Sequence, residues 1–385
     1  MKKPLLITII ILVVLLALPA VNFIRWAFQE KKPMNIVILD KTVPTFDRLG
    51  HRSLVYVLTN DRFVRKEKGG SFSAAKDYYG FVPLRPEREK QFRKRDFRLT
   101  ELLELAENND ALYYADTYGV FFNDWYQGIK KARRSRRLYG GLNNNDYLLM
   151  SEMKNRDKLV ILEYNTFDYP TAPLEKFKTE ELLGISSTGW MGQYYRSLDT
   201  VSAHGVPGWM PALYRKQYLE SWTFTNPGVV LLRENSIIVL EEGKHLTSAM
   251  PLITTSETAV ARLSVAPAVT FGNSFDVINP GQNDVISYFN LRTTPAGDTL
   301  LAVNDLQAAF PAVVQEPDNG NTYYFSGDFS NNKIPFWTSR FKGMDKMNRL
   351  LYTDNPEDSE RFFWLYYKPL IKGLFDEYYA ASSGK

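Results

Sequence analysis

The sequence predicts an α/β protein with an N-terminal transmembrane helix, then a mostly parallel, flavodoxin-like sheet with helices on both faces, and a β-rich extension. Three observations support this fold class. An apolar segment fills residues 5–24, short β-branched runs alternate with amphipathic helices over 34–185, and short β-like runs separated by turn residues fill 251–325. With 385 residues, the chain can bury a large core without covalent staples.

Composition excludes several kinds of chemistry. The chain has no cysteine, which excludes disulfides, thiolate nucleophiles, iron–sulfur clusters and Cys-ligated zinc. The formal net charge of +4 is too small to indicate a nucleic-acid partner. No nucleotide-binding or nucleophile-elbow motif is present, and we expect neither a cofactor nor a metal.

The N-terminus predicts a membrane anchor. Residues 1–4 form a basic tip, residues 5–24 are long enough to span the hydrocarbon core, and Trp26 and Phe28 are typical of an interfacial belt. The basic tip favours a cytoplasmic N-terminus, which would place the body in the periplasm or outside the cell. A cleaved signal peptide is the alternative.

Each later element follows from local pattern. Four short apolar runs end at or just before a carboxylate, as strands buried on both faces do: 35–39 before Asp40, 111–115 before Asp116, 158–162 before Glu163 and 321–325 before Asp328. Amphipathic periodicity predicts helices, and Arg233-Glu234-Asn235 predicts a hairpin turn. The predicted helices cover 51–64, 99–108, 146–156, 174–184 and 361–379.

These elements divide the body into three parts. We expect an α/β domain over 34–245, a β-rich extension over 246–335 that returns a strand to the sheet, and a C-terminal helical segment over 336–385.

The order of motifs resembles a known family. A strand ends in Asp40, a helix begins with His51, Gly140-Gly141 precede a helix, and Leu159 to Thr166 and Tyr324 to Asp328 follow. This layout resembles the class I glutamine amidotransferase-like fold in its trehalose-utilisation-like branch. The family's nucleophile is a cysteine on a strand–turn–helix elbow. Here the corresponding region offers Asn143, so the resemblance implies the fold without the thiol chemistry.

The four strand-end carboxylates, Asp40, Asp116, Glu163 and Asp328, are the candidate catalytic residues. The carboxyl ends of parallel strands meet at one edge of a sheet, where ligands of such folds bind. Two carboxylates roughly 5–10 Å apart could act as acid and base on a glycoside, and three could hold a hard cation. Capping of the turns that follow the strands is the structural alternative.

A second group mixes amide, hydroxyl, aromatic and basic side chains, the mixture that suits a sugar. Core packing by the aromatic residues is the alternative interpretation. The candidate ligand-binding residues are Asn165, Thr166, Trp190, Gln193 and Arg196.

Histidine and charge give weaker signals. His51, His204 and His245 lie far apart in sequence, which argues against a shared metal site. His51 is then either a helix-start residue or a general base near the crevice.

Residues 85–98 and 130–137 are strongly basic and could contact an anionic surface or be solvated loops. The residues assigned to anionic-surface binding are Arg133, Arg134, Arg136 and Arg137.

Three functions remain open at this point. The favoured hypothesis is a non-catalytic carbohydrate- or ligand-binding accessory protein of the cell envelope, because no thiol nucleophile or catalytic signature is present. The alternatives are a carboxylate-dependent glycoside hydrolase and a protein-partner subunit of a membrane complex. The expected partners are thus the membrane through residues 5–24, a glycan or a protein.

Overall fold

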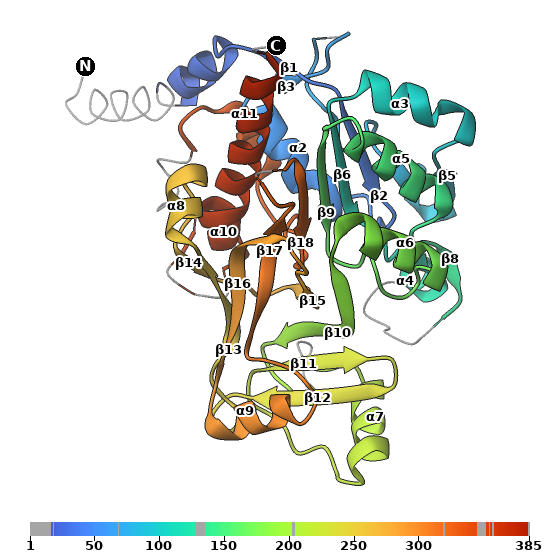
Figure 1. The fold of residues 1–385 in the computed structure, drawn as a ribbon, viewed down its shortest axis with the longest axis vertical. Coiled ribbons are helices and arrows are strands. Elements are labelled where there is room, and N and C mark those ends of the chain that lie inside the picture. The colour runs from blue at the N-terminus through green and yellow to red at the C-terminus, as the bar shows by residue number, and fades with distance from the viewer. Residues whose placement is uncertain are drawn as a thin grey trace, which may run out of the picture.

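A ten-stranded mixed sheet organises the molecule, with a smaller four-stranded sheet at one end (Figure 1). In the computed structural model, the large sheet has the order β14-β13-β16-β17-β18-β9-β6-β2-β4-β5 and the small sheet the order β12-β11-β10-β15. Two further pairs, β1-β3 and β7-β8, are two-stranded. The structure describes residue 17 and residues 19–67, 69–127, 135–201, 205–318, 320–344, 352–353, 355 and 358–383.

The strands of the large sheet come from most of the chain length. They are β2 (Ile36–Asp40), β4 (Tyr79–Pro83), β5 (Phe92–Arg95), β6 (Ala111–Asp116), β9 (Leu159–Glu163), β13 (Leu246–Thr255), β14 (Ala268–Thr270), β16 (Asp284–Thr293), β17 (Ala309–Gln315) and β18 (Thr322–Phe325). The remaining strands are β1 (Lys32–Pro33), β3 (Phe63–Val64), β7 (Val120–Phe121), β8 (Arg137–Tyr139), β10 (Ser186–Tyr195), β11 (Gly228–Arg233), β12 (Ser236–Glu241) and β15 (Ser274–Asn279).

Helices connect and cover these strands. The α-helices are α2 (Leu49–Asn60), α3 (Leu102–Asn108), α4 (Phe122–Tyr126), α5 (Asn144–Lys154), α6 (Pro173–Leu183), α7 (Trp209–Tyr218), α8 (Glu257–Leu263), α9 (Pro295–Ala302), α10 (Ser359–Phe362) and α11 (Lys368–Ser383). Short 3₁₀ segments are η1 (Glu87–Glu89), η2 (Leu99–Glu101) and η3 (Phe336–Arg340), and η5 (Phe363–Tyr367) is a π-helical turn between α10 and α11.

The prediction of a mostly parallel sheet is wrong. Five neighbouring strands run parallel to one another, namely β18, β9, β6, β2 and β4. Beyond β18 the sheet continues through β17, β16, β13 and β14, each antiparallel to the strand before it. At the other end β5 pairs antiparallel with β4. Local alternation predicts that these segments are strands, but it does not specify their neighbours. The four predicted strands that end at or near carboxylates are all present, as β2, β6, β9 and β18.

The parallel strands still have a recognisable order. Numbered along the chain, they lie in the spatial order 2-1-3-4-5 from β4 through β2, β6 and β9 to β18. In such doubly wound sheets the order reverses between the first and third strands, and ligands bind outside the carboxyl ends there. The reversal in this molecule lies between β2 and β6.

Apolar side chains cover both faces of this sheet. Alternate residues of β2 point to opposite faces, so Ile36 and Ile38 join the core beneath α2, η5 and α11, whereas Val37 and Leu39 pack toward α3 and α5 (Figure 1). The predicted terminal helix is therefore a buried covering element. The predicted helices on both faces are present.

The predicted membrane anchor is not supported. Residues 1–16 and 18, which include most of the predicted span, lie outside the described residues. In the ranges that the structure describes, no helix is both long and apolar enough to cross a membrane. This finding overturns the predictions of a transmembrane helix, a signal anchor and a single-pass membrane location.

The predicted aromatic belt also differs from what is observed. Residues 19–27 are helical, and the Trp26 side chain is buried, with its indole N–H donating to the carbonyl of Thr59 at 2.9 Å. The Arg62 guanidinium lies 4.5 Å from the centroid of the Trp26 ring. Trp26 therefore anchors this helix to the body, while Phe28 is exposed.

Candidate functional site

The four predicted carboxylates gather at the carboxyl edge of the parallel strands. Asp40 ends β2, Asp116 ends β6, Glu163 ends β9, and Asp328 follows β18. Asp40 and Asp116 are direct partners in the β2–β6 ladder. The negative charges of Asp40 and Asp328 both contribute to raising the pKa of Asp116, so the three side chains lie within electrostatic reach of one another.

Asp40 is an internal member of this cluster. Its side chain is fully buried; Oδ1 accepts the Thr42 N–H at 2.9 Å, and Oδ2 lies 2.6 Å from Nδ1 of His51. Nε2 of His51 lies 2.8 Å from the carbonyl of Ala74, which can only accept, so Nε2 carries a hydrogen. Both ring nitrogens of His51 are therefore engaged. The histidine holds Asp40 in place and is not free to act as a base.

Glu163 is the second internal carboxylate. It is fully buried; Oε1 accepts from the Tyr113 hydroxyl, and Oε2 accepts the Ser330 N–H at 3.0 Å. The Ser330 hydroxyl also donates to Oε2 at 2.8 Å and lies in contact with the carbonyl of Gly50. Burial, the largest cause, raises the pKa of Glu163 well above its usual value, while the hydrogen bonds from Tyr113 and Ser330 act in the opposite direction. Glu163 thus fastens the loop that carries Asp328 to β9.

Asp116 and Asp328 are the two members that reach solvent, since each side chain is only half-buried. Burial, followed by the charges of Asp328 and Asp40, raises the pKa of Asp116 well above its usual value. Burial, with a smaller contribution from Asp40, raises the pKa of Asp328 to about 6. Near neutral pH, Asp328 is therefore largely an ionised acceptor, while the pKa of Asp116 is shifted in the direction that favours its protonated form.

Polar groups on the neighbouring loops orient this outer pair. The Tyr118 N–H donates to Oδ1 of Asp116 at 2.7 Å, and the Thr42 hydroxyl also hydrogen-bonds this carboxyl. Asn331 donates from Nδ2 to Oδ2 of Asp328 at 2.9 Å. Asn273 ties the same loop by donating to the carbonyls of Asp328 and Asn331, both at 3.2 Å. The edge therefore offers hydroxyl, amide and carboxyl groups together.

The second predicted group does not form one surface. Asn165 and Thr166 follow β9 and are buried, and Trp190 on β10 is fully buried in the main core. Gln193 accepts from the Tyr195 hydroxyl at 3.0 Å and is exposed, as is Arg196. Packing thus accounts for Trp190.

The basic residues are only partly described. Arg133 and Arg134 lie outside the described residues. Arg136 is exposed over the ring of Phe122 at 5.3 Å, and Arg137 donates to the carbonyl of Pro170 at 2.7 Å. Arg137 therefore has a local structural partner.

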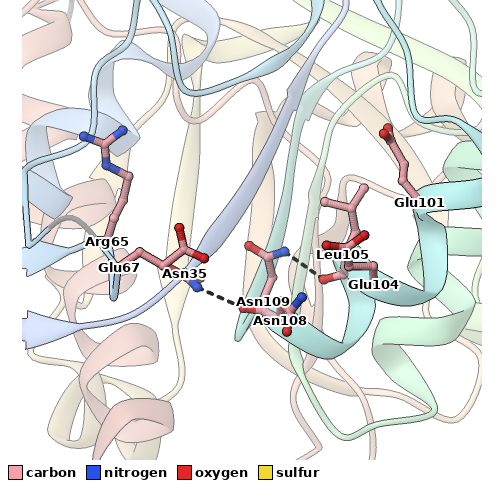
Figure 2. A pocket seen from close by; sticks show the side chains of 8 residues that line it. All are labelled: Asn35, Arg65, Glu67, Glu101, Glu104, Leu105, Asn108 and Asn109. Carbon is pink, nitrogen blue, oxygen red and sulfur yellow. Dashed lines mark hydrogen bonds between the residues drawn. The ribbon is translucent and has the colours of Figure 1, made fainter.

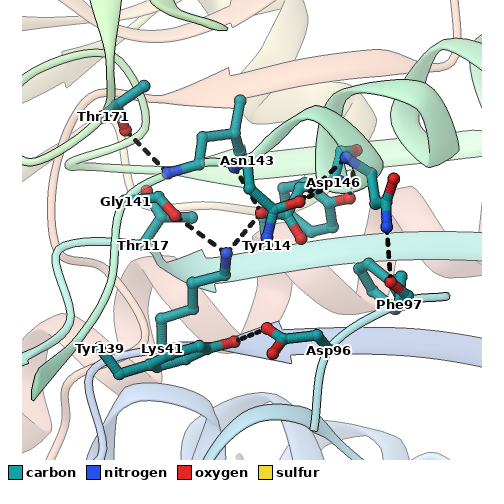
Figure 3. A network of polar contacts seen from close by, with 12 residues as sticks. Lys41, Asp96, Phe97, Tyr114, Thr117, Tyr139, Gly141, Asn143, Asp146 and Thr171 are labelled. Carbon is teal, nitrogen blue, oxygen red and sulfur yellow. Dashed lines mark hydrogen bonds and ion pairs between the residues drawn. The ribbon is translucent and has the colours of Figure 1, made fainter. Parts of the chain in front are cut away.

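The sequence did not reveal a buried ion pair just below this edge. Lys41 follows Asp40 directly, and its ammonium group contacts the Asp146 carboxylate and donates to the Gly141 carbonyl at 2.9 Å (Figure 3). Both side chains are 1% exposed. Asp146 also accepts the Asn143 N–H and so caps α5. Because 105 residues separate the partners, no local pattern could have predicted the pair.

Asp276 was not predicted from the sequence either. An acidic residue between the apolar residues of β15 is unusual, and this pattern could have indicated a buried carboxyl group. It is buried, accepts from the Asn165 N–H at 3.0 Å and the Tyr324 hydroxyl at 2.6 Å, and burial raises its pKa to about 8. It joins β15 to the loop after β9.

A hard-cation site is not supported at this edge. Across the described ranges, no three histidine, aspartate or glutamate side chains are placed to hold a metal ion together. The hydrogen bonds above use the inner carboxylates for structure instead.

A pocket of ≈ 360 Å³ lies at the opposite edge (Figure 2). Asn35 precedes β2, and Asn108 and Asn109 precede β6, so the pocket lies at the amino ends of these strands. None of the predicted site residues lines it. Its remaining walls are Arg65, Glu67, Glu101, Glu104 and Leu105.

Comparisons with known proteins leave the family open. No protein-family model and no curated protein matches the sequence. Among solved structures, the chain is similar to a beta-galactosidase from Bacillus circulans sp. alkalophilus, with 8% identity and a TM-score of 0.33. That match covers 77% of this chain and 30% of the beta-galactosidase chain.

Proposed function

We propose that this protein binds a carbohydrate at the carboxyl edge of its parallel strands, without transforming it. The observation that carries the proposal is the pair Asp116 and Asp328, two half-buried carboxyl groups within electrostatic reach of each other, with Asp116 at the reversal in strand order. The raised pKa of Asp116 favours its protonated form, which can donate a hydrogen bond, while Asp328 accepts. Sugar hydroxyls both donate and accept, so such a pair suits them.

The surrounding loops support the same ligand class. The Asn331 amide and the Thr42 hydroxyl already hydrogen-bond the two carboxyl groups and fix their directions. The half-buried ring of Tyr118, 4.9 Å from that of Phe121, follows Asp116 directly and offers an apolar surface for the C–H face of a sugar. A few convergent polar groups beside an aromatic surface are typical of small-ligand sites.

A second function is favoured by one specific observation. Asp116 and Asp328 are two half-buried carboxyl groups within electrostatic reach of each other, and the raised pKa of Asp116 is what a general acid needs in glycoside hydrolysis. In this alternative Asp116 protonates the leaving oxygen, and Asp328 is the base or nucleophile.

A panel of mono- and oligosaccharides, screened by thermal shift against the full chain, tests the binding proposal. A ligand of this site raises the melting temperature by mass action, and Asp116→Asn and Asp328→Asn abolish the shift. Glu152→Gln on α5, away from the edge, is the matched control and leaves the shift unchanged. A shift that persists in both aspartate variants contradicts the proposal.

Chromogenic aryl glycosides separate the two functions. Turnover by the full chain that Asp116→Asn removes establishes the hydrolase and rejects simple binding. A saccharide shift without turnover supports the binding proposal.

A further inference from the structure

The outer edge of the large sheet is a basic strand. β5 is the last strand in the sheet order and pairs on one side only, antiparallel to β4, from Gly80 opposite Arg95 to Pro83 opposite Phe92. The main-chain groups on the outer side of an edge strand are a template for another extended segment. Figure 1 shows β5 at the rim of the sheet, away from the antiparallel extension.

The inner contacts of β5 hold it in place. Phe92 stacks on Phe81 with ring centroids 4.5 Å apart, and Arg95 donates to the carbonyls of Lys76 at 2.9 Å and Tyr78 at 3.1 Å. The edge is therefore a fixed surface with a defined direction.

Charge selects what can pair with it. Arg93 and Lys94, in the middle of β5, are exposed. Residues 85–98 carry seven basic and three acidic side chains, a net charge of +4. One of the three acids, Asp96, already accepts from the Tyr139 hydroxyl. The strand edge and the positive charge thus coincide.

The same charges exclude a second copy of β5. Two such strands side by side would bring Arg93 and Lys94 against like charges, which disfavours pairing. An acidic extended segment meets opposite charges and main-chain hydrogen-bond partners at once.

We propose that β5 is a docking edge for an acidic, extended polypeptide segment of another protein, which adds to the large sheet as an eleventh strand. This inference does not depend on the carbohydrate site, which lies at the carboxyl ends of β2 and β6. The main-chain pairing distinguishes it from a general attraction for polyanions.

A fluorescent, nine-residue peptide of alternating Glu and Val, with blocked ends, is the probe. Its binding to the full chain is followed by fluorescence anisotropy at low salt. The double variant Arg93→Glu/Lys94→Glu reverses the charge at exposed positions, and we expect it to weaken binding about tenfold or more. Arg215→Glu/Lys216→Glu, at exposed positions on α7, is the matched control and leaves binding unchanged.

Two further probes test the mode of binding. A peptide of the same sequence with every internal amide N-methylated keeps its charge but cannot donate main-chain hydrogen bonds along either edge, and we expect it to bind about tenfold more weakly. Far-UV circular dichroism checks that each variant is folded, and Lys94→Gln gives a milder second variant with an intermediate loss.

Three results overturn the proposal. They are equal binding of the methylated peptide, equal binding by the folded Arg93→Glu/Lys94→Glu variant, and tighter binding of a single-stranded oligonucleotide of matched charge. The last result would identify the edge as a nucleic-acid contact.

Discussion

Asp40 lies opposite Asp116 in the β2–β6 ladder because Ala115 is an extra residue in β6. The register runs from Ile36 opposite Ala111 to Leu39 opposite Tyr114, and then passes from Tyr114 to Asp116. Without this bulge Asp40 would face Ala115, and the carboxyl group of Asp116 would lie one residue further along. Bulges re-aim side chains next to active sites. Here the bulge brings two carboxylates together where the strand order reverses.

This arrangement divides the carboxylates between two roles. Asp40 and Glu163 are fully buried and have hydrogen-bond partners on both oxygens. Asp116 and Asp328 are half-buried and face the loops at the edge. We therefore expect substitutions of the inner pair to lower stability and substitutions of the outer pair to change ligand binding.

The first prediction concerns Asp328 and pH. Its pKa of about 6 in the folded chain exceeds the value of about 3.9 expected when unfolded, so the folded state holds more protons between these limits. The contribution of this group to stability is therefore present below pH ~4 and is lost as pH rises through about 6. The Asp328→Asn variant has no carboxyl group to ionise at this position, so it does not lose this stability as pH rises.

Urea unfolding at several pH values measures the effect. We expect Asp328→Asn to be more stable than the native chain by about 1–3 kcal/mol at pH 7, and close to it at pH 4. Asn keeps an oxygen to accept from Asn331, so the comparison isolates the charge. An equal difference at both pH values would contradict the prediction.

The second prediction contrasts Glu163 with Asp116. Glu163→Leu leaves the Ser330 N–H and the Tyr113 hydroxyl without their acceptor, and we expect a loss of about 2–5 kcal/mol in the free energy of unfolding. Asp116→Asn keeps an acceptor for the Tyr118 N–H and removes a carboxyl group whose pKa is raised on folding, so we expect no loss of stability near neutral pH. Denaturant unfolding of the two variants measures both effects, and a larger loss in Asp116→Asn would reverse the assigned roles.

How far the sequence predicted this site depends on the range of each interaction. The strands that end at or near Asp40, Asp116, Glu163 and Asp328 follow from short apolar runs, which are local. The bulge at Ala115 and the Asp40–His51 contact depend on register and packing between elements, which no single segment encodes. The sequence thus predicted which carboxylates meet, but not which of them reach solvent.

The large sheet shows the same limit. Alternating patterns predict strands through 251–325, but pairing partners are non-local, so the antiparallel side of the sheet was not foreseen. Trp190 shows, for a single residue, that local sequence does not reveal non-local packing. Its neighbours in sequence suggest a polar loop, whereas β10 carries it into the core, where the Arg233 guanidinium lies 4.6 Å from its ring centroid.

The third prediction follows from that burial. Trp190→Ala removes a fully buried indole, and we expect a loss of about 3–5 kcal/mol in the free energy of unfolding. Trp190→Phe keeps most of the apolar volume and should lose less. If a saccharide ligand is found, its dissociation constant should be the same for Trp190→Phe and the native chain. A large loss of affinity in this folded variant would instead indicate that Trp190 contributes to ligand binding.

The last prediction concerns Lys41 and Asp146 below the edge (Figure 3). Lys41→Met leaves a buried carboxylate without its counter-charge, which costs about 3–5 kcal/mol in comparable buried pairs. Burial raises the pKa of Asp146 and the Lys41 charge lowers it, so Lys41→Met should raise this pKa further. Adding Asp146→Asn keeps an oxygen to cap α5 and removes the unpaired charge. Urea unfolding should therefore show the double variant to be more stable than Lys41→Met alone. If the two single losses simply add, the pair is not coupled, and the Gly141 carbonyl is the more important partner of Lys41.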